Sequence, residues 1–186
     1  MLIFLDRDGV INEDSDDYIR SLEDWIPLPG SIEAIAKLSL AGFTVAIVTN
    51  QSGLGRGYFE LEDLEGIHDR LCQLVEAQHG SIAGIFYCPH LPDADCSCRK
   101  PGIGLLKAAT HELQMDPAGA YMVGDSLKDL QAAQRFNCRP ILVKTGKGMG
   151  TLERINSDSP GVTEPQNIPV YADLAAATEA ILSNFK

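Results

Sequence analysis

The stretch Leu2-Ile3-Phe4-Leu5-Asp6-Arg7-Asp8-Gly9-Val10 places two carboxylates two positions apart, directly after four apolar residues. The apolar run predicts a buried strand that ends at Asp6. Open α/β sheets bind ligands beyond the carboxyl ends of their strands, so this acidic pair is placed for chemistry. Two close carboxylates repel each other unless a cation neutralises them, and oxygen ligands suit Mg²⁺. Asp6 and Asp8 therefore indicate Mg²⁺-assisted phosphoryl transfer, with an acidic turn after an edge strand as the alternative for the pair alone.

The rest of the chain alternates strand-like and helical patterns. Further apolar runs predict strands at 43–48, 82–87, 120–123 and 140–143, and helical periodicity predicts helices at 30–40, 61–79, 104–113, 127–136 and 172–182. Residues 156–169, rich in Ser, Pro, Asn and Gly, predict a surface loop. The alternation predicts one α/β domain over residues 1–186, with a Rossmann-like parallel sheet and helices on both faces.

Composition limits the partners. The chain has 186 residues, is 45% hydrophobic and carries a formal net charge of −11, which opposes binding to nucleic acid and to anionic membranes. No stretch has the basic flank and apolar core of a signal peptide, and none approaches the length of a membrane span. We therefore expect a cytoplasmic protein, monomeric, that acts on a small molecule.

Three further predicted strand ends carry polar residues. Thr49-Asn50-Gln51-Ser52 offers hydroxyls and amides, Lys100 offers a cation and Asp125 offers a third carboxylate. Each is commonplace alone, since a Thr-Asn turn is frequent, a lone lysine is usually solvated and an aspartate at a helix start is usually a cap. Because the carboxyl ends of parallel strands meet at one sheet edge, the set together predicts one site.

A cysteine cluster predicts a second metal site. Cys88, His90, Cys96 and Cys98 fall within eleven positions, and in a reducing compartment such spacing favours metal over disulfides. Four soft or borderline ligands suit a closed, structural Zn²⁺ site; separate buried thiols beside an exposed histidine are the alternative. This zinc loop, residues 88–98, leads directly into Arg99 and Lys100. The two remaining cysteines are expected in the core, and the three other histidines at surface or helix positions.

The ordered set Asp-x-Asp-Gly-Val, Thr-Asn, Arg-Lys-Pro and Gly-Asp-x-x-x-Asp resembles the four motifs of the haloacid-dehalogenase-like phosphatase superfamily, over about residues 1–145. The resemblance implies that Asp6 is the nucleophile that forms an aspartyl-phosphate, and that Asp8 is the general acid and base. It implies that Thr49 and Lys100 hold the transferring phosphoryl group.

The same resemblance implies the metal ligands. Mg²⁺ would lie on Asp6, the backbone carbonyl of Asp8 and Asp125, with Asp129 in a supporting position. The cysteine cluster would hold Zn²⁺.

Within this superfamily, the zinc loop together with Asp-Gly-Val-Ile-Asn and the run at 50–57 resembles the heptose bisphosphate phosphatases. This implies removal of the C7 phosphate of a heptose 1,7-bisphosphate, in ADP- or GDP-heptose biosynthesis. Histidinol-phosphate phosphatases share the loop and are the alternative. A polynucleotide 3′-phosphatase or a non-catalytic zinc-stabilised module is less favoured, because the chain is acidic and keeps both Asp6 and Asp8. Ser126 departs from the pattern, since several relatives carry a basic residue there.

The gaps between motifs are too short for an inserted cap domain, so loops should cover the site and read the substrate. Asp14, Asp16 and Asp17 are expected to accept hydrogen bonds from sugar hydroxyls. Arg99 is expected to bind a second phosphate, because its guanidinium can hold phosphate oxygens bidentately. The remaining substrate-binding candidates are Asn50, Gln51 and Ser52.

Overall fold

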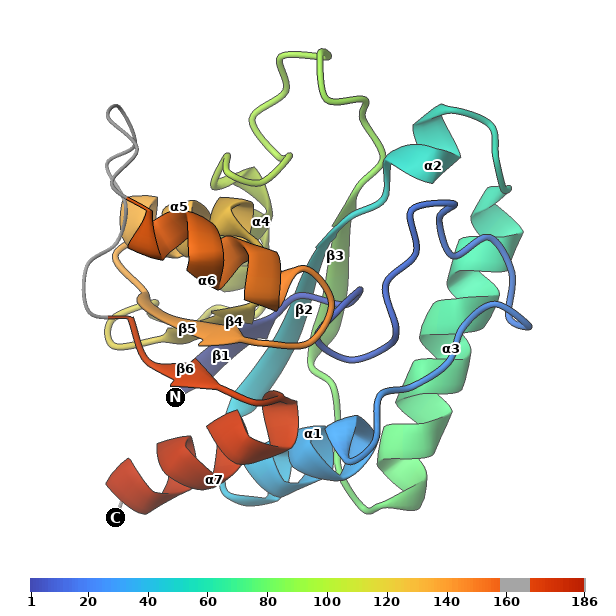
Figure 1. Cartoon of the computed structure of the whole chain (residues 1–186). Helices are drawn as coiled ribbons and strands as arrows, with labels where there is room; N and C mark the ends of the chain where they lie inside the picture. Colours follow the sequence, from blue (N-terminus) through green and yellow to red (C-terminus); the bar gives the residue numbers. More distant parts are fainter. Residues whose placement is uncertain (158–167, 186) are drawn as a thin grey trace.

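The computed structural model describes residues 1–157 and 168–185. All of its strands form one parallel sheet in the order β3-β2-β1-β4-β5-β6 (Figure 1). The strands are β1 (Leu2–Leu5), β2 (Thr44–Asn50), β3 (Gly84–Cys88), β4 (Tyr121–Gly124), β5 (Arg139–Val143) and β6 (Val170–Tyr171). The predicted parallel α/β architecture is confirmed.

Helices cover both faces of the sheet, as predicted (Figure 1). They are α1 (Ser31–Leu40), α2 (Ser52–Gly55), α3 (Leu61–Ala77), α4 (Gly104–Glu112), α5 (Leu127–Arg135), α6 (Gly148–Asn156) and α7 (Leu174–Asn184). Helix α1 packs against both α3 and α7 on one face, whereas α4 and α5 lie on the other.

Strand β1 explains why both faces are covered. Its side chains alternate, so that Ile3 and Leu5 join one hydrophobic cluster while Leu2 and Phe4 join the other. All four are at most 1% exposed, which is the pattern of a central parallel strand rather than of an edge strand. An edge-strand origin for the acidic pair that follows is therefore excluded.

The strand order places a ligand site beside β1. Chain order runs outward in one direction through β2 and β3 and in the other through β4, β5 and β6, so the order reverses between β1 and β4. The crevice at such a reversal is where open α/β sheets bind ligands. Asp6 lies at this point, and its backbone N–H donates to Val123 O at 3.0 Å.

Four elements differ from the sequence prediction. Helices α2 and α6 and strand β6 were not predicted, because α2 is a single turn, β6 has two residues and α6 starts with a Gly-x-Gly sequence that disfavours helix. The predicted helix 61–79 ends earlier, at Ala77, since His79 takes a positive φ of 62°. Most of the predicted loop 156–169 lies outside the described residues.

The segment between Asp8 and Thr49 holds only a loop, α1 and β2 in the described structure. We call residues 13–26 of that loop the flap. Its base is closed by a hydrogen bond from Glu13 N–H to Ile26 O at 2.9 Å. Within 1–157 and 168–185, no helix combines the length and the apolar character needed to cross a bilayer.

Candidate active site

A cavity lined by several acidic residues lies at the carboxyl ends of β1, β2 and β4. The cavity has a volume of about 680 Å³, and Asp6, Asp8, Thr49 and Asp125 line it. Residues from the flap, α5 and α6 complete its walls. The structure therefore brings the predicted catalytic residues of three separate strand ends into one pocket.

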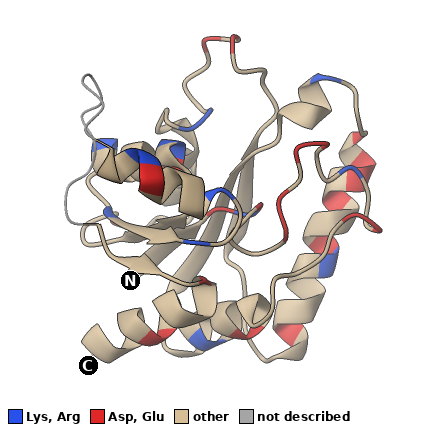
Figure 2. Cartoon of the chain, in the orientation of Figure 1, with Lys and Arg blue, Asp and Glu red and all other residues tan. Residues whose placement is uncertain are grey.

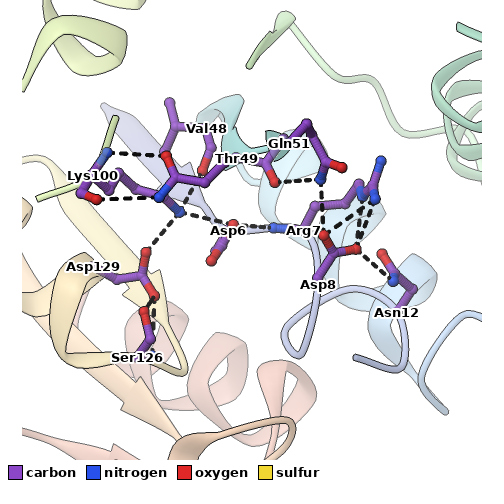
Figure 3. A network of polar contacts seen from close by, with 11 residues as sticks. Asp6, Arg7, Asp8, Asn12, Val48, Thr49, Gln51, Lys100, Ser126 and Asp129 are labelled. Atoms are coloured by element: carbon purple, nitrogen blue, oxygen red, sulfur yellow. Dashed lines mark hydrogen bonds and ion pairs between the residues drawn. The ribbon is translucent and has the colours of Figure 1, made fainter. Parts of the chain in front are cut away.

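Lys100 is a buried cation beside Asp6 and Asp129 (Figure 3). Its Nζ lies 2.8 Å from Asp6 Oδ1 and 2.6 Å from Asp129 Oδ1, and it donates to Val48 O at 2.8 Å. Burial alone lowers the pKa of Lys100, but the charges of Asp129 and Asp6 outweigh it and raise the pKa above its ordinary value. Lys100 is therefore charged at every physiological pH.

Asn50 fixes the position of Lys100 along the chain. The Lys100 N–H donates to Asn50 Oδ1 at 3.0 Å, and Asn50 Nδ2 donates to Lys100 O at 3.2 Å. Asn50 was predicted to bind substrate, and in this structure both ends of its amide are used to hold Lys100.

The carboxylates around Lys100 carry more negative charge than the lysine neutralises. Oxygens of Asp6, Asp125 and Asp129 lie within 4.8 Å of one another. Burial and the charge of Asp129 raise the pKa of Asp6 well above its ordinary range and raise that of Asp125 to about 7. A bound cation would neutralise this excess charge, and an all-oxygen donor set suits Mg²⁺.

Asp8 lies in the opposite electrostatic setting (Figure 3). The fully buried Arg7 reaches its Oδ1 at 2.8 Å, Asn12 Nδ2 donates to the same oxygen at 2.9 Å and Gln51 Nε2 donates to Oδ2 at 2.8 Å. Burial raises the pKa of Asp8, but the Arg7 charge and these hydrogen bonds together outweigh it, so the pKa is lowered. Asp8 is a carboxylate at neutral pH in the free protein.

Arg7, which pairs with Asp8, is itself contacted by a residue that sequence reasoning missed. Arg7 Nη1 lies 3.4 Å from His68 Nε2, which accepts the hydrogen bond because arginine can only donate. Burial and Arg7 lower the pKa of His68 to about 4, so this histidine is neutral. His68 was expected at a surface or helix position; it is on helix α3, but buried. The one available signal was Arg7 itself, a charged residue at the end of a buried strand, which needs partners.

Gln51 connects Asp8 to Thr49. Its Nε2 also donates to Thr49 Oγ1 at 2.9 Å, so the amide predicted to bind substrate bridges two catalytic candidates in this structure. Ser52 lines the pocket.

Ser126 has a structural use that accounts for its hydroxyl. Its Oγ donates to Asp129 Oδ2 at 2.6 Å and its N–H donates to the same oxygen at 3.0 Å, within a capping box at the start of α5. Ser126 thereby orients the carboxylate that pairs with Lys100. Asp129, predicted to support the metal site, uses one carboxylate oxygen for Lys100 and the other for Ser126.

The predicted zinc ligands converge. Cys88 Sγ lies 3.0 Å from Cys98 Sγ and 3.7 Å from Cys96 Sγ, and His90 Nδ1 lies 3.2 Å from Cys98 Sγ. Four ligands at tetrahedral Zn–S distances of about 2.3 Å would be separated by roughly 3.8 Å, so the cluster is compact enough for one Zn²⁺. Burial raises the pKa of the Cys96 thiol, but the backbone N–H of Arg99 and the neighbouring ligands bring it down to about 6.

The residues that line the pocket include acidic residues of the flap and basic residues of α5, of α6 and of the turn before α6. Figure 2 shows the acidic residues along the flap and the basic residues on these helices. On the flap, Asp14 pairs with Lys147 at 2.8 Å and Asp16 lines the pocket. Asp17 is not among the pocket-lining residues, and its backbone carbonyl accepts from Arg20.

The basic residues that line the pocket are Arg99, Lys128, Lys147 and Arg154. Apart from Lys147, none of them forms an ion pair with a carboxylate of the described residues. Burial, Arg99 and Lys147 lower the pKa of Lys128, as expected where cations crowd together. Of these four, sequence reasoning found only Arg99. Lys147 and Arg154 were missed because α6 and its preceding turn were not predicted, and Lys128 was missed although its helix, α5, was predicted.

Comparison with known proteins identifies the class of this site. Residues 3–137 match the family model described as haloacid dehalogenase-like hydrolase. The chain belongs to this family, as its four motifs predicted.

Its curated relatives are more specific. The chain is 52% identical over 181 residues to a D-glycero-beta-D-manno-heptose-1,7-bisphosphate 7-phosphatase of Pseudomonas aeruginosa, and the match covers 97% of each chain. It is 46% identical to the protein of the same name from Bordetella bronchiseptica, again over 97% of each. A crystal structure of a D,D-heptose 1,7-bisphosphate phosphatase from B. bronchiseptica, complexed with magnesium and phosphate, matches with a TM-score of 0.90, 45% identity and 98% coverage of both chains.

The cysteine cluster predicts the zinc content of the protein. Purified protein should contain about one zinc per chain, the count of a closed four-ligand site. Cys98→Ser should lose the zinc and lower Tm by roughly 4–8 °C, the equivalent of about 2 kcal/mol in a chain of this size. Cys72→Ser, outside the cluster, should keep both. Elemental analysis and thermal melts check this, and a zinc-free wild-type protein of unchanged Tm would contradict it.

The raised pKa of Asp125 predicts a pH dependence of stability without Mg²⁺. Between its ordinary pKa of 3.8 and about 7, the folded state holds a proton that the unfolded state has released, so the free energy of unfolding falls as pH rises through this window. Asp125→Asn removes that loss. Its Tm relative to wild type should therefore increase from pH 4 to pH 8, by roughly 2–4 °C for each kcal/mol recovered. The exposed Asp69→Asn is the control; parallel melting curves for all three proteins would refute the assignment.

Proposed function

We propose that this chain is a Mg²⁺-dependent phosphatase that hydrolyses the C7 phosphate of D-glycero-D-manno-heptose 1,7-bisphosphate, a step toward ADP- or GDP-heptose. The observation that carries the proposal is the position of Asp6, held by Lys100 at 2.8 Å at the sheet's reversal point. Supporting it, relatives at 46–52% identity over nearly the whole chain carry the name of this activity. Those relatives are named for heptose bisphosphate, so histidinol phosphate is not favoured.

Asp6 acts as the nucleophile in the first step. Its Oδ1 is held by Lys100 Nζ and by the N–H of Arg7 at 2.8 Å, which fixes the rotation of the carboxylate. A carboxylate oxygen forms a bond to the C7 phosphorus while the bond from phosphorus to the sugar oxygen breaks. Lys100, and Thr49 through its hydroxyl, stabilise the phosphoryl oxygens; positioning and charge stabilisation of this kind dominate phosphoryl transfer.

Asp8 moves the proton in both steps. As a carboxylate in the free protein, it takes up a proton when the negatively charged phosphate approaches and raises its pKa. It gives this proton to the leaving sugar oxygen. The resulting carboxylate then removes a proton from water, which attacks the aspartyl-phosphate and releases inorganic phosphate. Arg7, Asn12 and Gln51 hold Asp8 in place throughout.

The two metals have separate roles. Mg²⁺ would be held by Asp6, the backbone carbonyl of Asp8 and Asp125, and would neutralise charge on the phosphoryl group. Zn²⁺ would be held by Cys88, His90, Cys96 and Cys98, and would fix the loop that carries Arg99 and Lys100.

The pocket rim suits a sugar bisphosphate. Arg99, Lys128 and Arg154 pair with no carboxylate of the described residues and offer charge for the phosphate that is retained, and Lys128 supplies a cation on α5 although residue 126 is serine. Of these three, Arg99 is the one held by the zinc loop, since its Nη1 donates to His90 O at 3.2 Å. Asp14 and Asp16 on the flap are the acceptors proposed for sugar hydroxyls. Asp17 lies outside the pocket lining, and the amides of Asn50 and Gln51 would need to change partners to contact the sugar.

The function is tested by turnover on a substrate panel. Wild-type protein with Mg²⁺ should hydrolyse heptose 1,7-bisphosphate at least tenfold more efficiently than histidinol phosphate or a 3′-phosphorylated oligonucleotide, judged by kcat/KM. Asp6→Asn should abolish turnover, by a factor of about 10³ or more, with zinc content and Tm retained, because no nucleophile remains. Preference for histidinol phosphate would overturn the substrate, and residual Mg²⁺-dependent activity in the variant would overturn the covalent mechanism.

Arg99 should contribute to recognition of the second phosphate rather than to bond cleavage. Arg99→Ala should reduce kcat/KM for heptose 1,7-bisphosphate by about 10- to 100-fold, the loss expected for a charge-assisted hydrogen bond. Turnover of p-nitrophenyl phosphate, which has no second phosphate, should change less than threefold on the same preparation. Arg70→Ala, on the exposed side of α3, is the matched control. An equal loss on both substrates would assign Arg99 to the transferring phosphoryl group instead.

A further inference from the structure

We propose that Thr145-Gly146-Lys147, the turn between β5 and α6, is a fifth segment of the catalytic site, which holds the Asp125 carboxylate in the orientation that the cation requires. This inference rests on the proposed function, because it assigns Asp125 to Mg²⁺. None of the four motifs contains this turn. We call it the 145–147 turn.

Two hydrogen bonds tie the turn to the catalytic loops. The N–H of Lys147 donates to Asp125 Oδ2 at 2.7 Å, and Thr145 Oγ1 donates to Gly9 O at 2.6 Å. The first bond reaches the end of β4, and the second reaches the loop that carries Asp6 and Asp8. The turn therefore connects both sources of the expected metal ligands.

The bond to Asp125 has a specific consequence for metal binding. Rotation of a carboxylate about its last side-chain bond is soft, so an unheld Asp125 would sample a broad range of orientations. With Oδ2 satisfied by Lys147, the carboxylate is fixed in the cluster where oxygens of Asp6, Asp125 and Asp129 lie within 4.8 Å. Mg²⁺ demands near-ideal octahedral geometry, so it is sensitive to the rotation of each ligand.

Two glycines allow the 145–147 turn and the loop after β1 to lie this close to Asp125. Gly146 has a φ of +55°, and a Cβ on it would lie 2.5 Å from Gly9 Cα and press against Asp125 Oδ2. Gly9, with a φ of +79°, faces it, and a Cβ there would meet the same carboxylate and lie 3.1 Å from Gly146 Cα. Asp125 is thus enclosed by two backbones that only glycine allows so close.

The turn also reaches the flap. Lys147 Nζ pairs with Asp14 at 2.8 Å, while its own backbone N–H binds Asp125. The orienting contact to Asp125 is a backbone contact, so the conformation of the turn, fixed by Thr145 and Gly146, is what the inference concerns.

Two variants of the turn test the inference, with two controls. Thr145→Val removes the hydroxyl that binds Gly9 O, and Thr145→Ser keeps it. Gly146→Ala inserts the Cβ beside Asp125. Gly119→Ala is the control for backbone strain, because Gly119 has a similar φ of +75° and nothing within 4 Å of its Cβ position.

The readout is direct Mg²⁺ binding by titration calorimetry on the full chain, alongside the Mg²⁺ concentration for half-maximal turnover, zinc content and Tm. Thr145→Val should weaken Mg²⁺ binding by about 3- to 10-fold, the range expected for one hydrogen bond, and Gly146→Ala by more. Thr145→Ser and Gly119→Ala should bind Mg²⁺ like wild type. Turnover of Thr145→Val should recover at high Mg²⁺, as it would for a positioning role.

The outcomes separate the possibilities. If Thr145→Val and Gly146→Ala bind Mg²⁺ like wild type, or if Gly119→Ala weakens binding as much as Gly146→Ala, the inference is overturned and the proposed function stands. If both turn variants lose Tm and zinc without a change in Mg²⁺ affinity, the turn is only structural and the inference fails. If wild-type protein itself does not bind Mg²⁺, the proposed function fails together with the inference.

Discussion

The ion pairs of Lys100 with Asp6 and Asp129 are the interactions on which the rest of the site depends. Burying several carboxylates in one cleft is costly, and the single lysine offsets only part of that cost. The remaining excess of negative charge raises the pKa of Asp6 and would favour a cation bound beside it. Asp8, two residues away, has its own ion pair with Arg7. The pKa of Asp8 is therefore lowered, whereas the pKa of Asp6 is raised.

Local sequence sufficed for the residues that lie at strand ends. Asp6, Thr49 and Asp125 could be predicted because each follows or ends an apolar run, and parallel topology brings such positions to one edge. Lys100 could be predicted from its motif, but it does not lie at a strand end: it reaches the site from the loop between β3 and α4. The same logic gave the two-faced sheet, since every residue of β1 is apolar.

What could not be predicted depends on contacts between distant segments. His68 contacts Arg7 from a helix more than fifty positions away, and nothing in the pattern of α3 marks it. Lys147 and Arg154, the pocket-lining cations of α6 and its preceding turn, were missed because that helix lacks a clear apolar repeat and opens with glycines. The internal use of Asn50 and Gln51 was also hidden, because an amide side chain serves a ligand or a neighbouring residue equally well.

The central place of β1 in the sheet has a consequence for how the chain folds during its synthesis. Ile3 pairs with Tyr121, so the first strand cannot complete its pairing until most of the polypeptide has been made. Until then, one edge of an entirely apolar strand stays open to other chains, which is an aggregation hazard. The cysteine loop, whose ligands span few residues, can close much earlier. During synthesis, the cysteine loop could therefore bind a metal before the acidic cleft forms, and Asp6 would reach its final place among the last parts of the molecule.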